Sequence, residues 1–75
     1  MIGWHAPPVT IDAAMEDRRI GTALRALRRR RGLRQLDVAE AAGVGQTTIS
    51  RAERGHLKSL SNAALRRVAA ALDAG

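Results

Sequence analysis

The three-residue stretch Gly43-Val44-Gly45 limits the possible folds of this 75-residue chain more than any other feature. Apolar residues recur at helical spacing on both sides of it. They are Val38, Ala39, Ala42, Ile49 and Ala52. Because so short a connection forces two helices into a steep crossing, the sequence predicts short helices over about 35–42 and 46–54 that meet at a sharp angle. Gly43 can take the positive φ that this turn needs.

The second of these helices carries polar side chains that a hydrophobic core does not need. With its apolar residues turned inward, the outer face presents Gln46, Thr47, Ser50 and Arg51. A helix that reads the major groove of DNA needs fairly short polar side chains that bond to base edges. The pattern therefore favours a helix-turn-helix, in which the second helix reads DNA. The competing interpretation is an amphipathic helix with a solvated face.

A longer helix is predicted ahead of this pair. Asp12 is its expected N-cap, and Gly32 is expected to end it. Its buried seam recurs at i, i+4 and i+7, at Ile20, Leu24 and Leu27. Gly21 lies inside the helix, where glycine costs about 1 kcal/mol relative to alanine. It indicates either close packing against another helix or a second helix start.

The two ends of the chain differ in character. A last helix is predicted over about 61–72, and its expected inward residues are Leu65, Val68, Ala69 and Leu72. The pair Pro7-Pro8 disfavours helix, so residues 1–11 are expected to form a flexible arm. The remaining residues 12–75 are expected to form one helix-turn-helix domain of the all-α class.

Charge points to a polyanionic partner. The chain has 13 Lys and Arg against 7 Asp and Glu, which gives a formal net charge of +6 and a sequence pI near 11.7. With one Trp and no Phe or Tyr, the chain lacks the aromatic side chains that stack on single-stranded bases. Duplex DNA is the expected partner. Without a long apolar run or a signal peptide, a cytoplasmic protein that does not enter membranes is expected.

The side chains available for catalysis are few. The chain has no Cys, and its two histidines, His5 and His56, lie far apart in the sequence. A thiolate site, a metal cage and a paired nucleophile and base are therefore not expected. The sequence predicts a protein that is not an enzyme and that needs neither a metal nor another cofactor.

The stretch IGTALRALRRRRGLRQLDVAEAAGVGQTTISRAERG closely resembles the lambda-repressor-like family of DNA-binding domains, also called the xenobiotic-response-element or Cro/C1-type family. The resemblance covers roughly residues 20–72. It is carried by Gly21, Leu24, Arg28, Gly32, Leu33, Gln35, Val38, Ala39, Gly43, Val44, Thr48, Ile49, Ser50, Glu53 and Gly55. It implies a compact four- to five-helix bundle, and a fifth helix is not expected within these 75 residues.

The resemblance also implies roles for individual residues. Base reading is expected of Gln46, Thr47, Ser50 and Arg51. Gln35 matches a family glutamine that holds a phosphate and steadies the first recognition residue; the alternative is that Gln35 is only a polar helix-starting residue. From their positions at the start of the second helix or at and after its end, phosphate binding is also expected of Thr48, Arg54, His56 and Lys58. Arg28 and Glu53 resemble a buried or half-buried structural ion pair, whereas an exposed Glu53 would contribute little.

Several positions depart from the family pattern. Arg34 and Gly45 stand where a Ser or Thr cap is common, so the two short helices are expected to start less firmly. Leu36 replaces a usually polar residue and could cover the arm or a partner. The dense cluster of Arg29, Arg30, Arg31 and Arg34 is open to two interpretations, a phosphate contact or a solvated helix end.

The main functional prediction is sequence-specific binding of double-stranded DNA by a transcriptional regulator, which could pair as a homodimer on DNA. A different class remains open: an antitoxin-type module that uses the same helix-turn-helix domain to hold a protein partner, with Leu36 and the arm as contacts.

Overall fold

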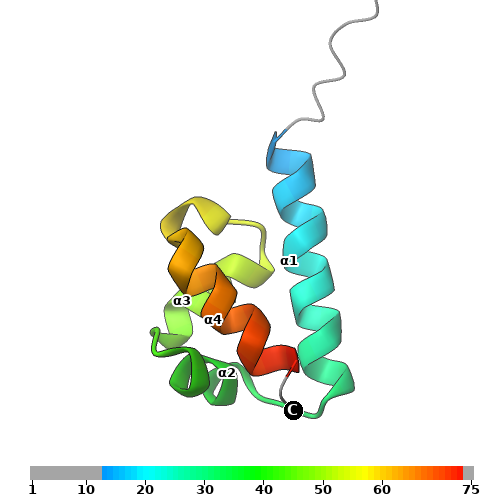
Figure 1. Ribbon diagram of the computed structural model, residues 1–75. Helices are drawn as coiled ribbons and strands as arrows, with labels where there is room; N and C mark the ends of the chain where they lie inside the picture. The colour runs from blue at the N-terminus through cyan, green and yellow to red at the C-terminus, as the bar shows by residue number, and fades with distance from the viewer. Residues whose placement is uncertain (1–12, 74–75) are drawn as a thin grey trace, which may run out of the picture.

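Residues 13–73 are described by the computed structural model, and all of their regular structure is helical. The elements are α1 (Ala13–Arg30), α2 (Gln35–Ala42), α3 (Gln46–Glu53), the 3-10 turn η1 (Leu57–Ser59) and α4 (Asn62–Asp73). The long α1 runs along one side of the bundle, and the other helices pack beside it (Figure 1). The all-α prediction is confirmed. The predicted arm and the predicted cap Asp12 lie outside the described residues.

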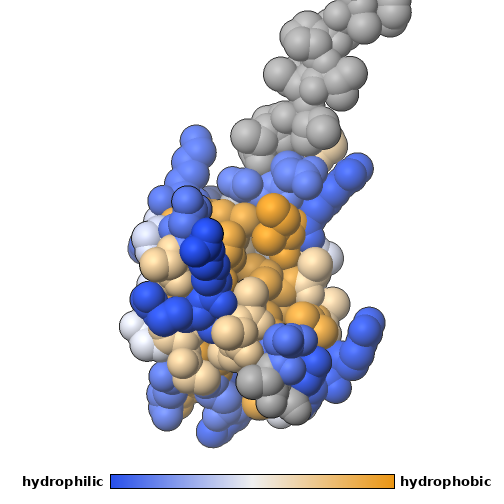
Figure 2. Space-filling view, viewed as in Figure 1, coloured by the Kyte–Doolittle hydropathy of each residue, from blue (hydrophilic) through white to orange (hydrophobic). Residues whose placement is uncertain are grey.

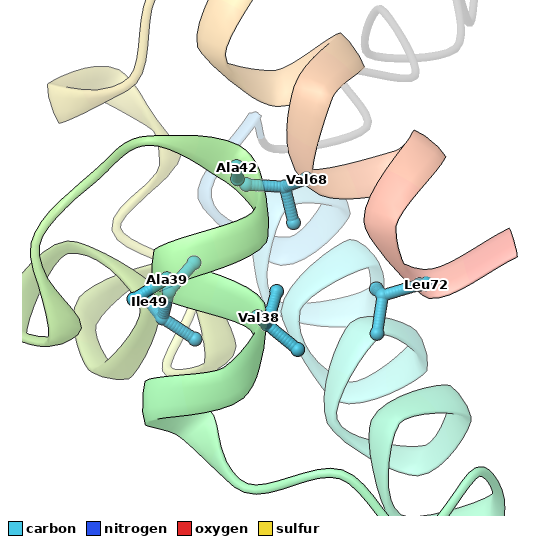
Figure 3. Packing of buried hydrophobic residues seen from close by; sticks show 6 residues of the cluster. All are labelled: Val38, Ala39, Ala42, Ile49, Val68 and Leu72. Carbon is cyan, nitrogen blue, oxygen red and sulfur yellow. The ribbon is translucent and has the colours of Figure 1, made fainter. Parts of the chain in front are cut away.

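The core lies between α2, α3 and α4. Six side chains from these helices converge in it (Figure 3): Val38, Ala39, Ala42, Ile49, Val68 and Leu72. The predicted seam of α1 is only half-buried, and its Leu24 and Leu27 pack against the edge of this cluster. Apolar side chains accordingly reach the surface between α1 and α4 on the face that Figure 2 shows.

Gly21 lets α1 approach the end of α3. A Cβ atom at this position would lie 2.5 Å from the carbonyl oxygen of Ala52, 2.8 Å from that of Glu53 and 2.8 Å from the nitrogen of Gly55. All three are backbone atoms, which cannot move aside as a flexible side chain can. Because α1 continues through Gly21 without a break, close packing is the correct interpretation and a second helix start is wrong.

The inward face of α4 is rotated from the predicted one. Val68 and Leu72 are buried as expected and Leu65 is half-buried, but Ala69 is exposed and Ala64 is buried instead. With about 100° between successive helical residues, Ala69 lies too far round from Val68 to reach the core. The 3-10 turn η1, in which Leu57 is buried, was not predicted from the sequence.

The observed limits of α3 and α4 lie close to the predicted ones. The end of α3 comes one residue early, and α4 begins one residue late. Ser61 caps α4, because its Oγ accepts a hydrogen bond of 3.0 Å from the backbone nitrogen of Ala64. The connection between α3 and α4 therefore contains the 3-10 turn η1 and ends at the Ser61 cap.

The close contact at Gly21 predicts whether a substitution there raises or lowers the stability of the fold. Helix propensity alone favours alanine over glycine, but Gly21→Ala places a methyl group against three backbone atoms. We expect Gly21→Ala to lower the free energy of unfolding by about 1–3 kcal/mol, the usual cost of overpacking, in urea titrations. Ala26→Gly, at an exposed position of the same helix, should show the ordinary loss of about 1 kcal/mol. A more stable Gly21→Ala variant would contradict the close approach.

Candidate nucleic-acid interface

The turn between α2 and α3 is built as its glycines predict. Gly43 adopts φ 69°, in the left-handed region, and the nitrogen of Val44 then donates to the carbonyl oxygen of Ala39 at 3.0 Å. Gly45 is extended, and its carbonyl oxygen accepts from the nitrogen of Thr48 at 3.0 Å. The turn is held from outside as well, since Arg67 Nε donates to the carbonyl oxygen of Ala42 at 2.8 Å.

The start of α2 corrects one sequence prediction. Arg34 stands at the N-cap and its side chain cannot accept a hydrogen bond, but the Asp37 carboxylate accepts from the Arg34 backbone nitrogen at 2.7 Å. The same carboxylate accepts from Arg34 Nε and Nη2 at 3.1 and 2.9 Å. These bonds lower the pKa of Asp37 and raise that of Arg34. The expectation of a weak start to α2 is wrong because Asp37 supplies the missing interaction.

The two faces of α3 separate cleanly. Ile49 and Ala52 are buried against the rest of the bundle. Three of the four predicted base readers are exposed, namely Gln46, Thr47 and Arg51, and the fourth, Ser50, is half-buried. The structure therefore brings the four predicted side chains to one helix and leaves three of them open to a ligand.

An ion pair joins the end of α1 to the end of α3. Arg28 Nε lies 2.5 Å from Glu53 Oε2, and Arg28 Nη2 lies 3.1 Å from Glu53 Oε1. Only 12% of the Arg28 side chain and 5% of the Glu53 side chain are exposed, so the pair is not a surface contact. The hydrogen bond to Glu53 raises the pKa of Arg28, which keeps the guanidinium charged.

Two further bonds extend this pair to α2. Arg28 Nη1 donates to the carbonyl oxygen of Leu33 at 2.8 Å, which fixes the link between α1 and α2. Gln35 Nε2 donates to Glu53 Oε1 at 3.1 Å. The amide nitrogen of Gln35 thus contacts Glu53 rather than Gln46, the first of the predicted recognition residues. Spacing along the chain gives no signal for this bond.

The predicted phosphate contacts lie at the rim of α3. Arg54, His56 and Lys58 are exposed in the segment that follows the helix, and Gln35 and Thr48 are half-buried in the first turns of α2 and α3. The side chains of Arg29, Arg30 and Arg31 are exposed at the other end of the bundle, and Leu36 is 41% exposed on α2. A protein contact at Leu36 remains a prediction.

The chemistry of this surface is that of binding. Amide, hydroxyl and guanidinium groups are the donors and acceptors that pair with base edges, and arginine and lysine pair with phosphates. In the part of the chain that the structure describes, no group of three or more His, Cys, Asp and Glu residues could hold a metal ion. None of the described helices is long and apolar enough to cross a membrane.

Two short helices that cross at a glycine turn, with a polar outer face on the second, define a helix-turn-helix domain. A family model described as helix-turn-helix matches residues 24–74. The chain belongs to this Cro/C1-type, lambda-repressor-like family of DNA-binding domains, as its resemblance indicated. Among curated proteins, no sequence matches the chain.

The network around Glu53 predicts strong coupling between two substitutions. Arg28→Ala or Glu53→Ala leaves the other charge shielded from water and without its main partner, so each should cost about 3 kcal/mol of unfolding free energy. The double variant should lose less than the sum, by more than about 1 kcal/mol in a double-mutant cycle measured by urea titration.

The exposed pair Arg34 and Asp37 offers the matched control for that cycle. These side chains are 77% and 33% exposed, so solvent screens their attraction and the same cycle should give only weak coupling. Equal coupling energies in the two pairs would contradict the conclusion that the shielded Arg28–Glu53 pair stabilises the fold more than a surface pair does.

Asp37 predicts a dependence of stability on pH. Because its pKa is lowered below the ordinary value of 3.8, Asp37 stabilises the fold above pH 3.8, and this contribution is lost as pH falls through the lower folded value. Asp37→Asn should therefore be less stable than the parent protein near neutral pH, and the difference should shrink in acid. Thermal unfolding at pH 7 and at pH 3 measures this difference, and a constant gap would contradict the role of the carboxylate.

Proposed function

We propose that this protein is a sequence-specific double-stranded DNA-binding domain of a transcriptional regulator, and that α3 enters the major groove. The observation that carries this proposal is the division of α3 into a buried face, Ile49 and Ala52, and an exposed polar face that begins at its first residue, Gln46. Recognition helices of this class contact bases from their N-terminal turns. The net charge of +6 supports a duplex as partner.

The exposed side chains suit particular base edges. Gln46 can form two hydrogen bonds with adenine, Arg51 can do so with guanine, and the Thr47 methyl group can contact a thymine methyl group. Ser50 is half-buried, and we expect it to reach less far into the groove. Gln46 and Arg51 are therefore the proposed main determinants of sequence preference, and Thr47 and Ser50 are the proposed lesser ones.

Phosphate contacts would fix the position of the helix in the groove. We assign this role to Gln35 and Thr48 at the helix starts, and to the segment after α3 with Arg54, His56 and Lys58. Such contacts contribute affinity for every sequence and carry no direct sequence information. A single recognition helix reads only a few base pairs, so we further propose that two copies pair on a duplex, with half-sites about one helical turn apart.

Selection of binding sites from random duplexes tests the proposed function. We expect a consensus made of two half-sites, and binding to it that weakens steeply as salt rises because phosphate contacts release counterions. Absence of any consensus, or equal affinity for single strands, would contradict the proposal and would favour the protein-partner alternative.

The reading face can be tested by two substitutions in the same assay. Gln46→Ala and Arg51→Ala should each cost about 1–3 kcal/mol on the selected site and should flatten the base preference, with little change on unrelated duplexes. Arg66→Ala removes the same charge from an exposed position on α4 and should leave the consensus unchanged. If Gln46→Ala also selects the parent consensus, the assignment of this face is wrong.

A further inference from the structure

A cationic surface continues from α3 onto the first half of α1. One shallow hollow beside α3 is lined by Arg51, Arg54, His56 and Ser59. A second hollow is lined by Asp17, Arg18, Arg54, Gly55, His56 and Lys58. Because Arg54 and His56 line both, the hollows adjoin. We call this joined area, from Arg51 to Arg18, the flanking surface.

Backbone packing fixes the part of α1 that belongs to the flanking surface. A Cβ atom on Gly55 would lie 2.8 Å from Arg18 Cγ and 2.9 Å from Arg18 Cα. The stem of Arg18 therefore rests directly on Gly55, the second residue after the end of α3. Gly21, one turn further along α1, contacts the same stretch of backbone. These backbone contacts hold the Arg18 position beside the end of α3. The Arg18 residue is nevertheless exposed at the surface.

The charges of the flanking surface suit a chain of phosphates. Arg18, Arg51, Arg54 and Lys58 are cationic, and Asp17, half-buried in the second hollow, is the one carboxylate among its lining residues. Both hollows are open to solvent, and flexible arginine and lysine side chains are among their lining residues, which suits an extended polyanion better than an enclosed small anion. The flanking surface begins at Arg51, one of the proposed base-reading residues. A DNA strand bound along this surface would therefore be continuous with the DNA that α3 is proposed to read.

We propose that the flanking surface binds the DNA backbone beside the half-site, and that Arg18 is a phosphate-binding residue. This inference rests on the proposed function. Residues 17 and 18 precede the segment that matches the family model, 24–74, so this contact comes from the first part of α1 and lengthens the footprint of the domain. Asp17 opposes the approach of phosphates and limits the affinity that this surface supplies.

The test uses the selected duplex with long flanks and a matched duplex in which the flanking phosphates carry neutral methylphosphonate linkages. Arg18→Gln should weaken binding to the long duplex about fivefold to tenfold and should reduce the slope of the salt dependence by about one. Asp17→Asn should strengthen binding, because it removes a repulsive charge. On the neutral-flank duplex the two substitutions should have no effect, and the parent protein should bind less tightly than on the long duplex.

Arg19→Gln is the matched control, because Arg19 is an exposed neighbour that lines neither hollow of the flanking surface. It should bind as the parent protein does, and circular dichroism should show that each variant is folded. If the parent protein binds both duplexes equally, or if Asp17→Asn leaves affinity unchanged, the flanking surface does not contact DNA. Such a result leaves the proposed function intact as long as the parent protein selects a consensus, whereas loss of that selection overturns the proposed function itself.

Discussion

The carboxylate of Glu53 is the point on which the arrangement of the helices depends. It is the last residue of α3, and it accepts hydrogen bonds from Arg28 in the last turn of α1 and from Gln35 at the first residue of α2. A buried charge is costly unless it is paired and hydrogen-bonded, and no buried side-chain nitrogen or oxygen within residues 13–73 lacks a partner. Three helix ends are thereby held together. The C-terminal end of α3 is fixed by this network, and the Gly43 turn fixes its N-terminal end.

Small residues make this arrangement possible in a short chain. Ala39, Ala42 and Ala52 are each 1% exposed, and their methyl groups let helix backbones approach closely. Gly21 takes the same approach further, since no side chain fits between α1 and the end of α3. Such a core contains little apolar volume per residue, so each misplaced methyl group or unpaired charge removes a large part of the stability that a domain of this size has.

Features that arise within a few residues were predictable from spacing, whereas long-range contacts were not: the Arg28–Glu53 pair was expected only from the family resemblance. The limits of α2 and the conformation of Gly43 follow from helical spacing and glycine chemistry, which act within a few residues. The bonds from Gln35 to Glu53 and from Arg67 to the Ala42 carbonyl span 18 and 25 residues. They depend on how helices pack, which spacing does not encode. The prediction that Ala69 faces the core was wrong for a related reason. Ala and Leu occur on several faces of α4, and periodicity alone does not choose among these faces.

The pairing of acids within the domain also explains how the proposed DNA-binding surface can contain carboxylates. Glu53 is the last residue of α3, the helix proposed to read bases, and Asp37 lies in the first turn of α2. Without a partner, both carboxylates would repel the phosphates of a nearby DNA backbone. Each is held by an arginine, Arg28 or Arg34. Pairing inside the protein therefore removes the repulsion, while Arg51 and Arg54 remain exposed. Arg28 and Arg34 thus serve in internal pairs, whereas Arg51 and Arg54 contribute positive potential to the proposed binding face.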